Sequence, residues 1–470
     1  MEDEDIRYMR WKQTTKALLG AVRKETYQPY SIPAVPDDLR KSNESAYMPK
    51  LVSIGPRYKG KKELLPMEEI KWCCVTSLIS RTFGQDTIET CLETVIKLDA
   101  AVRASYVDVI TLDRYDLATN MVFDGCFLLE LIICESTLDT EIPIPFNGKS
   151  PGIEVKKMEY VISDLMLVDN QIPLFILKTL FEKLIGSSNQ MHEFIQNLAL
   201  PLFGLSGKLM VKSTSHFLDV IYSYLEMGWV DKKIENDYSY LEMGWVDKKI
   251  DNEVRIYLGN VRHLFQEQRL HRCATRLKAA GITIQSLEND DDINFKLTTH
   301  FYERKGRLEI PRLIITQTTE VKWRSFIAWE HHKKKLSTRS SSAADWRSSI
   351  CTSTALLFRD LICCPSDVQL LKDRRVIVDQ SNKSNRDLVA FFHSIASGID
   401  SGIIDRKHTT MFLALNIFRT KRNYLTKIFI LLRHYFSRSA WWEYMVFASV
   451  VTFLTFVQTC YAIIAYHFPK

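Results

Sequence analysis

The stretch from Tyr444 to Ala465, YMVFASVVTFLTFVQTCYAIIA, contains no charged residue, and it constrains the chain more than any other feature. As a helix, about 22 residues rising about 1.5 Å each span roughly 33 Å, which matches a hydrocarbon core about 30 Å thick. Aromatic residues near both ends suit the headgroup level. A buried core helix is the alternative. We predict one C-terminal transmembrane helix whose membrane-contacting residues are Trp441, Trp442, Tyr444, Phe447, Val451, Phe453, Leu454, Phe456, Val457, Tyr461, Ile463 and Ile464.

The segment before this stretch is basic, with no acidic residue between Asp405 and Glu443. Positive charges near an anionic leaflet contribute about 1 kcal/mol each, and the positive-inside rule places such a segment in the cytosol. We expect a tail-anchored, single-pass protein of the plasma membrane or an endomembrane, with the bilayer as a partner and a cytosolic main domain. A solvated helix face is the alternative for the juxtamembrane basic residues Arg419, Lys421, Arg422, Lys427, Arg433 and Arg438.

Composition and local motifs argue against several classes of protein. Lys+Arg 62 against Asp+Glu 56 gives a net charge of +6, too weak a field to argue for nucleic acid. The ten cysteines show neither C-x-x-C nor a metal-ligand spacing with histidine, so we expect buried reduced thiols, no metal and no cofactor. The first residues, MEDEDIRYMR, do not form the cationic start of a secretory signal peptide.

The rest of the chain predicts a mainly α fold with a small antiparallel β element. We expect an extended arm over residues 1–50, a helical domain over 30–435 and the anchor over 436–470. Within the domain, FDGCFLLELIIC and DLMLVDNQIPLFILKTLFEKLI are apolar nearly all round, which indicates buried elements. Pro66 suits a first helical turn, and Asp169 or Asn170 is predicted to cap a helix that opens at Gln171. The β element is expected near 282–316, turning at Lys305–Gly306.

One internal repeat lies within a duplicated insert at 222–253. The sequence YSYLEMGWVDKKI begins at Tyr222 and again at Tyr238, a period of sixteen positions. Sixteen steps of about 100° turn a helix by about 160°, so both copies cannot bury the same face. We therefore expect a single slippage event in a tolerant connection, since repeat architectures need three or more units.

Motifs of known enzymes are missing: the sequence has no G-x-G-x-x-G, phosphate loop, G-x-S-x-G or H-E-x-x-H. Weak candidates are Cys273 beside His271, the doublet His331–His332 in a basic loop, and the cluster Asp290–Asp292. Cys273 and His271 are two positions apart, so in a helix their side chains would point to different faces. The basic loop around the histidine doublet would repel a cation, and the acidic cluster lacks the ligand spacing of an EF-hand. We therefore expect a protein without catalytic, cofactor or metal residues.

Several motifs occur in a characteristic order: AYMPKLVSIGPRYKG, MEEIKW, FDGCFLLELI, DLMLVDNQIPLFILKTLF, SHFLDVIYSYL, GRLEIPRLII, FIAWE and HYFSRSAWWEYMVFASVVTFLTFVQTCYAIIAY. This ordered set resembles the plant family named domain of unknown function 247, which includes the UPF0481-type membrane proteins. The resemblance runs from about Tyr30 onward, and where the family has Pro-Tyr-His-His-Gly this chain has Pro56-Arg57-Tyr58-Lys59-Gly60. It implies a plant membrane-associated protein of unknown activity; some grass members are implicated in self-incompatibility.

Three functions follow as hypotheses. The first is a membrane-anchored interaction or signalling module that binds an unknown protein at the cytosolic face. The second is an extracellular-facing recognition determinant of the self-incompatibility type, which glycosylation of Asn43 or Asn382, each followed by a serine two positions on, would support. The third is a membrane-anchored enzyme of an unrecognised class, which a pocket of convergent polar groups would support.

Overall fold

A computed structural model describes short stretches between residues 4 and 12, and then residues 31–81, 87–136, 153–184, 191–205, 207–209, 214–230, 269–287, 299–303, 305–337, 349–399, 408–418 and 441–467. The chain divides into two units, Met1–Leu413 and Ala414–Lys470. The first contains the helices and both sheets, and the second contains the apolar helix α19 (Trp441–His467). The basic residues Arg419 to Arg438 and the acidic cluster Asp290–Asp292 lie outside the described residues.

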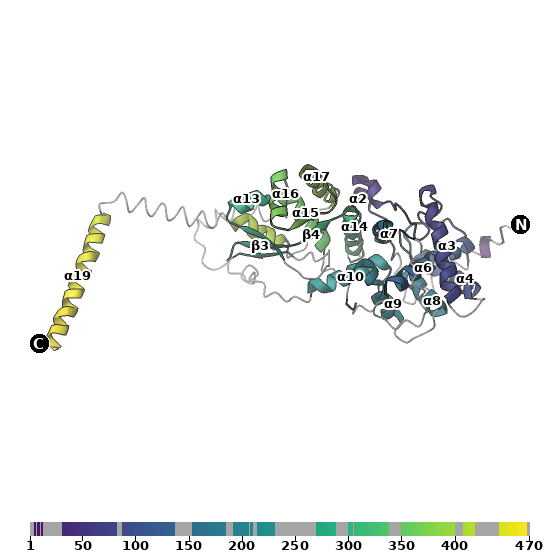
Figure 1. Cartoon of the computed structure of the whole chain (residues 1–470), viewed down its shortest axis with the longest axis horizontal. Coiled ribbons are helices and arrows are strands. Elements are labelled where there is room, and N and C mark those ends of the chain that lie inside the picture. Colours follow the sequence, from purple (N-terminus) through teal and green to yellow (C-terminus); the bar gives the residue numbers. More distant parts are fainter. Residues whose placement is uncertain are drawn as a thin grey trace. The chain divides into compact units, whose positions relative to one another are not determined.

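The first half of the larger unit is helical (Figure 1). Pro66 occupies the first turn of α3 as predicted, where its missing N–H would have no helical partner anyway. The elements are α2 (Asp37–Ser42), η1 (Glu44–Tyr47), η2 (Lys62–Leu64), α3 (Leu65–Arg81), α4 (Thr87–Lys97), α5 (Asp99–Ala104), α6 (Arg114–Ser136), α7 (Val155–Leu165), α8 (Leu174–Leu184), α9 (Met191–Ala199), η3 (Pro201–Phe203) and α10 (Phe217–Val230).

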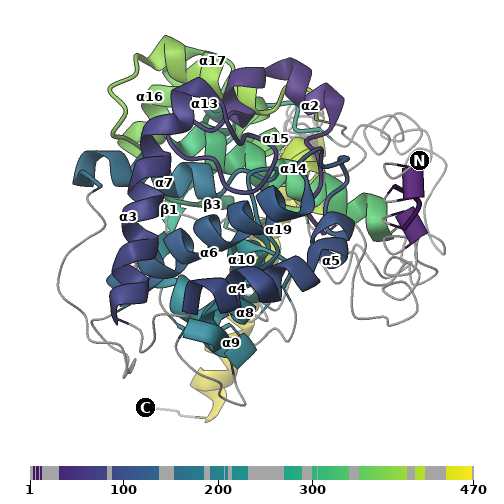
Figure 2. The same cartoon turned by 90° about the vertical axis from the view of Figure 1, so that its right-hand side faces the viewer.

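Helix α6 is the central helix of this half and packs against α3, α4 and α8 (Figure 2). Its sequence FDGCFLLELIIC is buried on every side, as the absence of a polar face predicted. Gly125 allows α8 to approach closely, because a Cβ at this position would lie 2.3 Å from the Leu180 Cδ1 atom. The first half therefore builds its core around one apolar helix.

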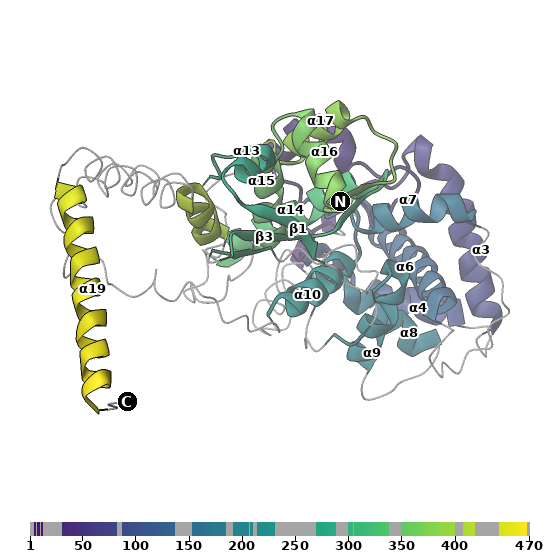
Figure 3. The same ribbon diagram turned by 60° about the vertical axis from the view of Figure 1, so that its left-hand side comes forward.

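The second half combines short strands with covering helices, with α13 and α16 on one side of the β1–β3 pair (Figure 3). Its three-stranded sheet has the order β1-β3-β2, and β4 and β5 form a second sheet. The elements are α13 (Ala274–Ala279), β1 (Thr283–Leu287), β2 (His300–Tyr302), β3 (Arg307–Pro311), β4 (Leu313–Ile315), α14 (Thr319–Ser337), α15 (Ile350–Leu361), α16 (Pro365–Asp373), β5 (Ile377–Asp379) and α17 (Asn385–Ile395).

The predicted antiparallel element is only partly correct. Strands β2 and β3 are antiparallel and turn at Lys305–Gly306, where Gly306 has a φ of 58°. Strand β1 pairs with β3 in parallel, and β4 pairs in parallel with β5, a strand that the sequence did not predict. Alternating burial, as at Leu308 and Ile310, shows which face meets the core but not which way a neighbouring strand runs.

The first copy of the repeat supplies the packed helix. Its start, Tyr222, is fully buried in α10, and its hydroxyl donates to Glu330 Oε1 at 2.9 Å. Residues 231–268, which include the second copy, lie outside the described residues.

A non-helical segment, Lys50–Gly55, passes through the helical half and depends on side chains for its hydrogen bonds. The backbone N–H groups of Lys50, Leu51 and Val52 donate to Asp164 at 2.7–3.1 Å. The N–H of Gly55 donates to Asp124 Oδ2 at 2.8 Å. Buried backbone donors must be paired, so these carboxylates position the segment.

Gly55 lies close against the backbone of Gln171. It has a φ of +80°, and a Cβ there would lie 2.5 Å from the carbonyl oxygen of Gln171. Only glycine fits both the backbone conformation and this distance.

Lys71 on α3 neutralises the carboxylates beneath the segment. Its fully buried Nζ donates to Asp124 Oδ1 at 2.6 Å, to Glu68 Oε1 at 2.6 Å and to the Ser53 carbonyl at 2.5 Å. Burial alone would lower the pKa of Lys71, but Asp124 and Glu68 outweigh burial and raise the pKa above its ordinary value. Lys71 therefore remains charged inside the core.

The predicted helix cap at Asp169 or Asn170 is wrong. Helix α8 begins at Leu174, and the fully buried Asn170 instead binds the Lys50–Gly55 segment. Its Oδ1 accepts from the Ile54 N–H at 2.7 Å, and its Nδ2 donates to the carbonyls of Val52 and Asp164 at 3.1 and 2.9 Å. Asp169 accepts from Arg40 at 2.6 Å. Local spacing could not distinguish these contacts from a cap.

We predict that Asn170→Ala lowers the free energy of unfolding by about 2–4 kcal/mol, because it leaves the buried Ile54 N–H without an acceptor. A lost helix cap would cost only about 1 kcal/mol. Chemical denaturation of the purified chain measures the difference. The control is Asn385→Ala, whose amide donates to Gln369 at the surface and which should change stability by less than about 0.5 kcal/mol. Equal losses in both variants would contradict the assignment.

Candidate functional site

Helix α19 contains the predicted membrane-contacting residues. Its backbone is helical from Trp441 to His467, and its described side chains carry large exposed apolar groups, including Phe447 at 71% and Tyr461 at 76% exposure. Phe453, Leu454 and Phe456 are also exposed. A helix that is apolar all round normally lies inside a protein or a membrane, so this exposure requires an explanation.

By length and composition, one helix in the described part of the chain could cross a membrane, and it is Arg114–Glu135 of α6. Within its most apolar window, 83% is buried, as expected for a core helix. The apolar part of α19 with described side chains, Phe447–Tyr461, is shorter. The helical backbone of α19 extends beyond it at both ends, over 27 residues.

Glu330 is the most perturbed acid of the second half. It lies fully buried on α14 and accepts hydrogen bonds from Tyr222 on α10 and from Cys351 and Thr352 on α15. The Thr352 hydroxyl adds a fourth bond at 2.5 Å. Burial raises the pKa of Glu330 to about 7, although these hydrogen bonds act in the opposite direction. Glu330 therefore joins three helices through one carboxyl group.

The histidine doublet is not in a loop as predicted, because α14 continues to Ser337. His332 stacks on Trp329 with ring centroids 5.4 Å apart, and the buried His216 meets the edge of the same ring at 4.6 Å. Burial lowers the pKa of His216 to about 4. The apolar and aromatic environment of His216 favours a neutral packing residue.

Three residues that stand where the resemblance predicted Tyr-His-His, namely Arg57, Tyr58 and Lys59, make structural contacts. Arg57 forms ion pairs with Asp108 and, at 3.2 Å, with Asp169. The Tyr58 hydroxyl lies 3.1 Å from Asp169 Oδ1, and burial together with this carboxylate raises the pKa of Tyr58 to about 12. Lys59 pairs with Glu68. These side chains extend the charged network around the Lys50–Gly55 segment.

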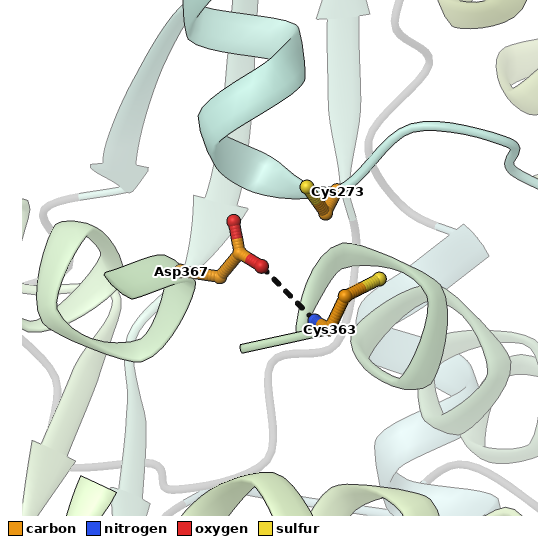
Figure 4. A group of neighbouring side chains, drawn as sticks. All are labelled: Cys273, Cys363 and Asp367. Carbon is orange, nitrogen blue, oxygen red and sulfur yellow. Dashed lines mark hydrogen bonds between the residues drawn. The ribbon is translucent and has the colours of Figure 1, made fainter. Parts of the chain in front are cut away.

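A cluster of thiols and a carboxylate forms where α13 meets α16. The Cys273 Sγ, the Cys363 Sγ and a carboxylate oxygen of Asp367 all lie within 4.8 Å of one another. Figure 4 shows Cys273 at the start of α13, with Asp367 to its left on another helix and Cys363 below it. We call these three residues the thiol cluster. Cys273 is buried, whereas Cys363 is exposed, so the cluster is open on one side.

Asp367 holds the thiol cluster together. It lies in the first turn of α16, where its Oδ2 accepts from the backbone N–H groups of Cys363 at 3.0 Å and Cys364 at 3.1 Å. Its Oδ1 accepts from the Thr275 N–H of α13 at 2.8 Å. Burial would raise the pKa of Asp367, but these hydrogen bonds outweigh burial and lower it. The carboxylate is therefore ionised and joins both segments.

The thiol cluster was not predicted from the sequence. Cys273 was expected to be a helical neighbour of His271, whereas residues 269–273 precede α13 and Cys273 is its N-cap. Cys363 is ninety positions further along the chain, and no spacing rule connects residues so far apart. The available local signal was Cys364-Pro365 followed by Asp367, a capping box at the start of α16.

The structure thus belongs to the class of mainly helical proteins with small mixed and parallel sheets. Residues 32–455 match the family described as plant protein of unknown function, domain of unknown function 247, and the chain belongs to this family. The resemblance predicted from the motifs is therefore confirmed.

Two relatives come from Arabidopsis thaliana. The UPF0481 protein At3g47200 is 24% identical over 446 residues, which cover 92% of this chain and 86% of the relative. The putative UPF0481 protein At3g02645 is 26% identical over 207 residues, which cover 42% of this chain and 37% of the relative. No solved structure matches the chain.

We predict that Glu330 makes stability fall as pH rises. Its folded pKa of about 7 lies above its ordinary value of 4.5, so its contribution is complete below about pH 4.5 and is lost as pH rises through about 7. At 1.36 kcal/mol per pKa unit, the loss is roughly 3 kcal/mol. Glu330→Gln should remove this slope while lowering stability at every pH.

Denaturation of wild type and variant across this pH range tests the prediction, and the difference between them isolates Glu330 from other buried acids. Glu226→Gln, a half-exposed neighbour on α10, is the control and should retain the wild-type slope. Parallel curves for wild type and Glu330→Gln would show that the carboxyl group is not the source.

Proposed function

We propose that this chain is a membrane-anchored, non-catalytic interaction module, held in a bilayer by α19 with its helical body in the cytosol. The observation that carries the proposal is the exposure of a helix that is apolar on all sides. In water, each large apolar side chain left exposed loses about 1.5–3 kcal/mol relative to burial. Lipid covers all faces of such a helix at once, whereas a protein groove covers one.

The dimensions of α19 agree with a bilayer. Its 27 residues give a length of about 40 Å, and the uncharged part gives about 33 Å against a hydrocarbon core of about 30 Å. The aromatic residues Trp441, Trp442 and Tyr461 lie toward its ends, where headgroups would surround them.

The polar side chains of α19 also suit an apolar solvent. The Thr455 hydroxyl donates to the Val451 carbonyl at 2.6 Å, and the Thr459 hydroxyl donates to the Thr455 carbonyl at 2.7 Å. Thr452 makes the same bond to Ala448. Hydroxyl groups that are satisfied within their own helix can enter hydrocarbon without an unpaired donor.

The chemistry of the body supports a non-catalytic role. The buried side chains Lys71 and Asp124 bond to each other, while Asp164 and Glu330 accept backbone N–H groups. A surface for a protein partner is available on α3, where Leu65 and Trp72 are exposed two helical turns apart. Aromatic residues of this kind frequently act as anchors in interfaces.

We predict that the double substitution Leu454→Arg with Val457→Arg releases the chain from membranes. Each arginine near the centre of a transmembrane helix costs about 2.5–3.5 kcal/mol of insertion free energy. Flotation of plant membranes through a density gradient measures the association, because aggregates do not float. The control is Val107→Arg with Val109→Arg, which adds the same charges at exposed positions of the body and should still float. Flotation of the α19 variant at the wild-type level would exclude α19 as the anchor.

We predict that the body carries no N-linked glycan in plant cells. Asn382 is the better reporter, because it is exposed before the Ser384 cap of α17, while the Asn43 amide donates to Glu320 at 2.9 Å. Wild type and Asn382→Gln should therefore migrate alike with and without glycosidase. An acceptor sequon placed on a spacer after Lys470 is the positive control. An Asn382-dependent mass shift would place the body in the lumen or outside the cell and favour extracellular recognition.

A further inference from the structure

We propose that Cys273, Cys363 and Asp367 form a binding site for a thiophilic divalent cation of the zinc type. The three ligand atoms already lie within 4.8 Å of one another. With zinc–sulfur distances of about 2.3 Å and zinc–oxygen distances of about 2.1 Å, ligands of a tetrahedral site lie about 3.5–3.8 Å apart. Side-chain movements of about 1 Å would therefore complete the contacts.

The ligand types select the cation. Two sulfur atoms and one carboxylate favour zinc over calcium or magnesium, which prefer oxygen ligands. The exposed Cys363 leaves a path from solvent and a position for a fourth ligand. The Cys364 thiol donates to Asp367 Oδ2 at 3.2 Å.

The backbone around the thiol cluster is set by hydrogen bonds that do not depend on a cation. Asp367 accepts N–H groups from both Thr275 and Cys363, which holds the α13 and α16 segments at a fixed separation. Cys273, the N-cap of α13, is two positions before Thr275 and therefore moves with it. The cation would find its ligands arranged in advance and would join two segments ninety positions apart.

A titration of the full-length chain tests the proposal. The protein is purified in detergent with a non-thiol reductant, stripped of metal by a chelator, and titrated with Zn²⁺ in competition with a chromophoric chelator. Wild type should bind one equivalent, and Co²⁺ in its place should show thiolate-to-metal charge-transfer absorption. Zn²⁺ should also raise the melting temperature, because it binds the folded state.

Three variants separate the outcomes. Cys363→Ser alters an exposed side chain and should weaken Zn²⁺ binding at least tenfold and abolish the thermal shift. Cys273→Ser should act in the same way. Because Cys273 is buried, the Cys273→Ser variant could fail to fold, and the test then rests on Cys363→Ser. Cys73→Ser removes an exposed thiol on α3 and should behave as wild type.

Three results would overturn the site. The first is a wild type that binds no Zn²⁺, and the second is a Cys363→Ser variant that binds as well as wild type. The third is a Cys273–Cys363 disulfide in protein isolated from plant membranes without reductant, detected as the linked pair of peptides in a non-reducing digest. That result would make the thiol cluster a redox pair instead.

Discussion

The capture of backbone N–H groups by buried carboxylates is the interaction on which the helical half depends. Residues Lys50 to Gly55 cross the interior without forming a helix or a strand, so their donors have no partner of their own. Asp164, Asn170 and Asp124 supply the acceptors from α7, from the connection before α8 and from α6. Three regions of the sequence are thereby fixed to one extended segment.

Lys71 supplies the counter-charge for one of these acceptors, Asp124. Burying the Asp124 carboxylate alone would be costly, and Asp124 and Glu68 in turn keep Lys71 charged. The ion pair need not add net stability over an apolar core. Its effect is to allow a polar segment to pass through the centre of an apolar bundle.

Helix α14 connects the two halves of the larger unit through buried polar side chains. Near its start, the buried Arg324 donates to Ser42 of α2 at 3.1 Å and to Ser394 of α17 at 2.7 Å. Six residues further along the helix, Glu330 joins α10 and α15. The helices of this unit are thus tied by polar contacts between distant residues, and substitutions at those positions should behave like core substitutions.

The sequence by itself determined the elements whose signal is local. The apolar character of α6, the start of α3 at Pro66, the turn at Lys305–Gly306 and the family itself could be predicted, because each depends on neighbouring residues or on motif order. Only the tertiary structure decided the contacts between residues that are distant in the sequence. Asn170 binds the Lys50–Gly55 segment, β1 pairs in parallel with β3, and Cys273 lies beside Cys363. The periodicity of a sequence indicates which side of a helix or strand is apolar. It does not indicate which distant segment will cover that side, because the free energy that favours one packing partner over another comes from contacts that form only on folding.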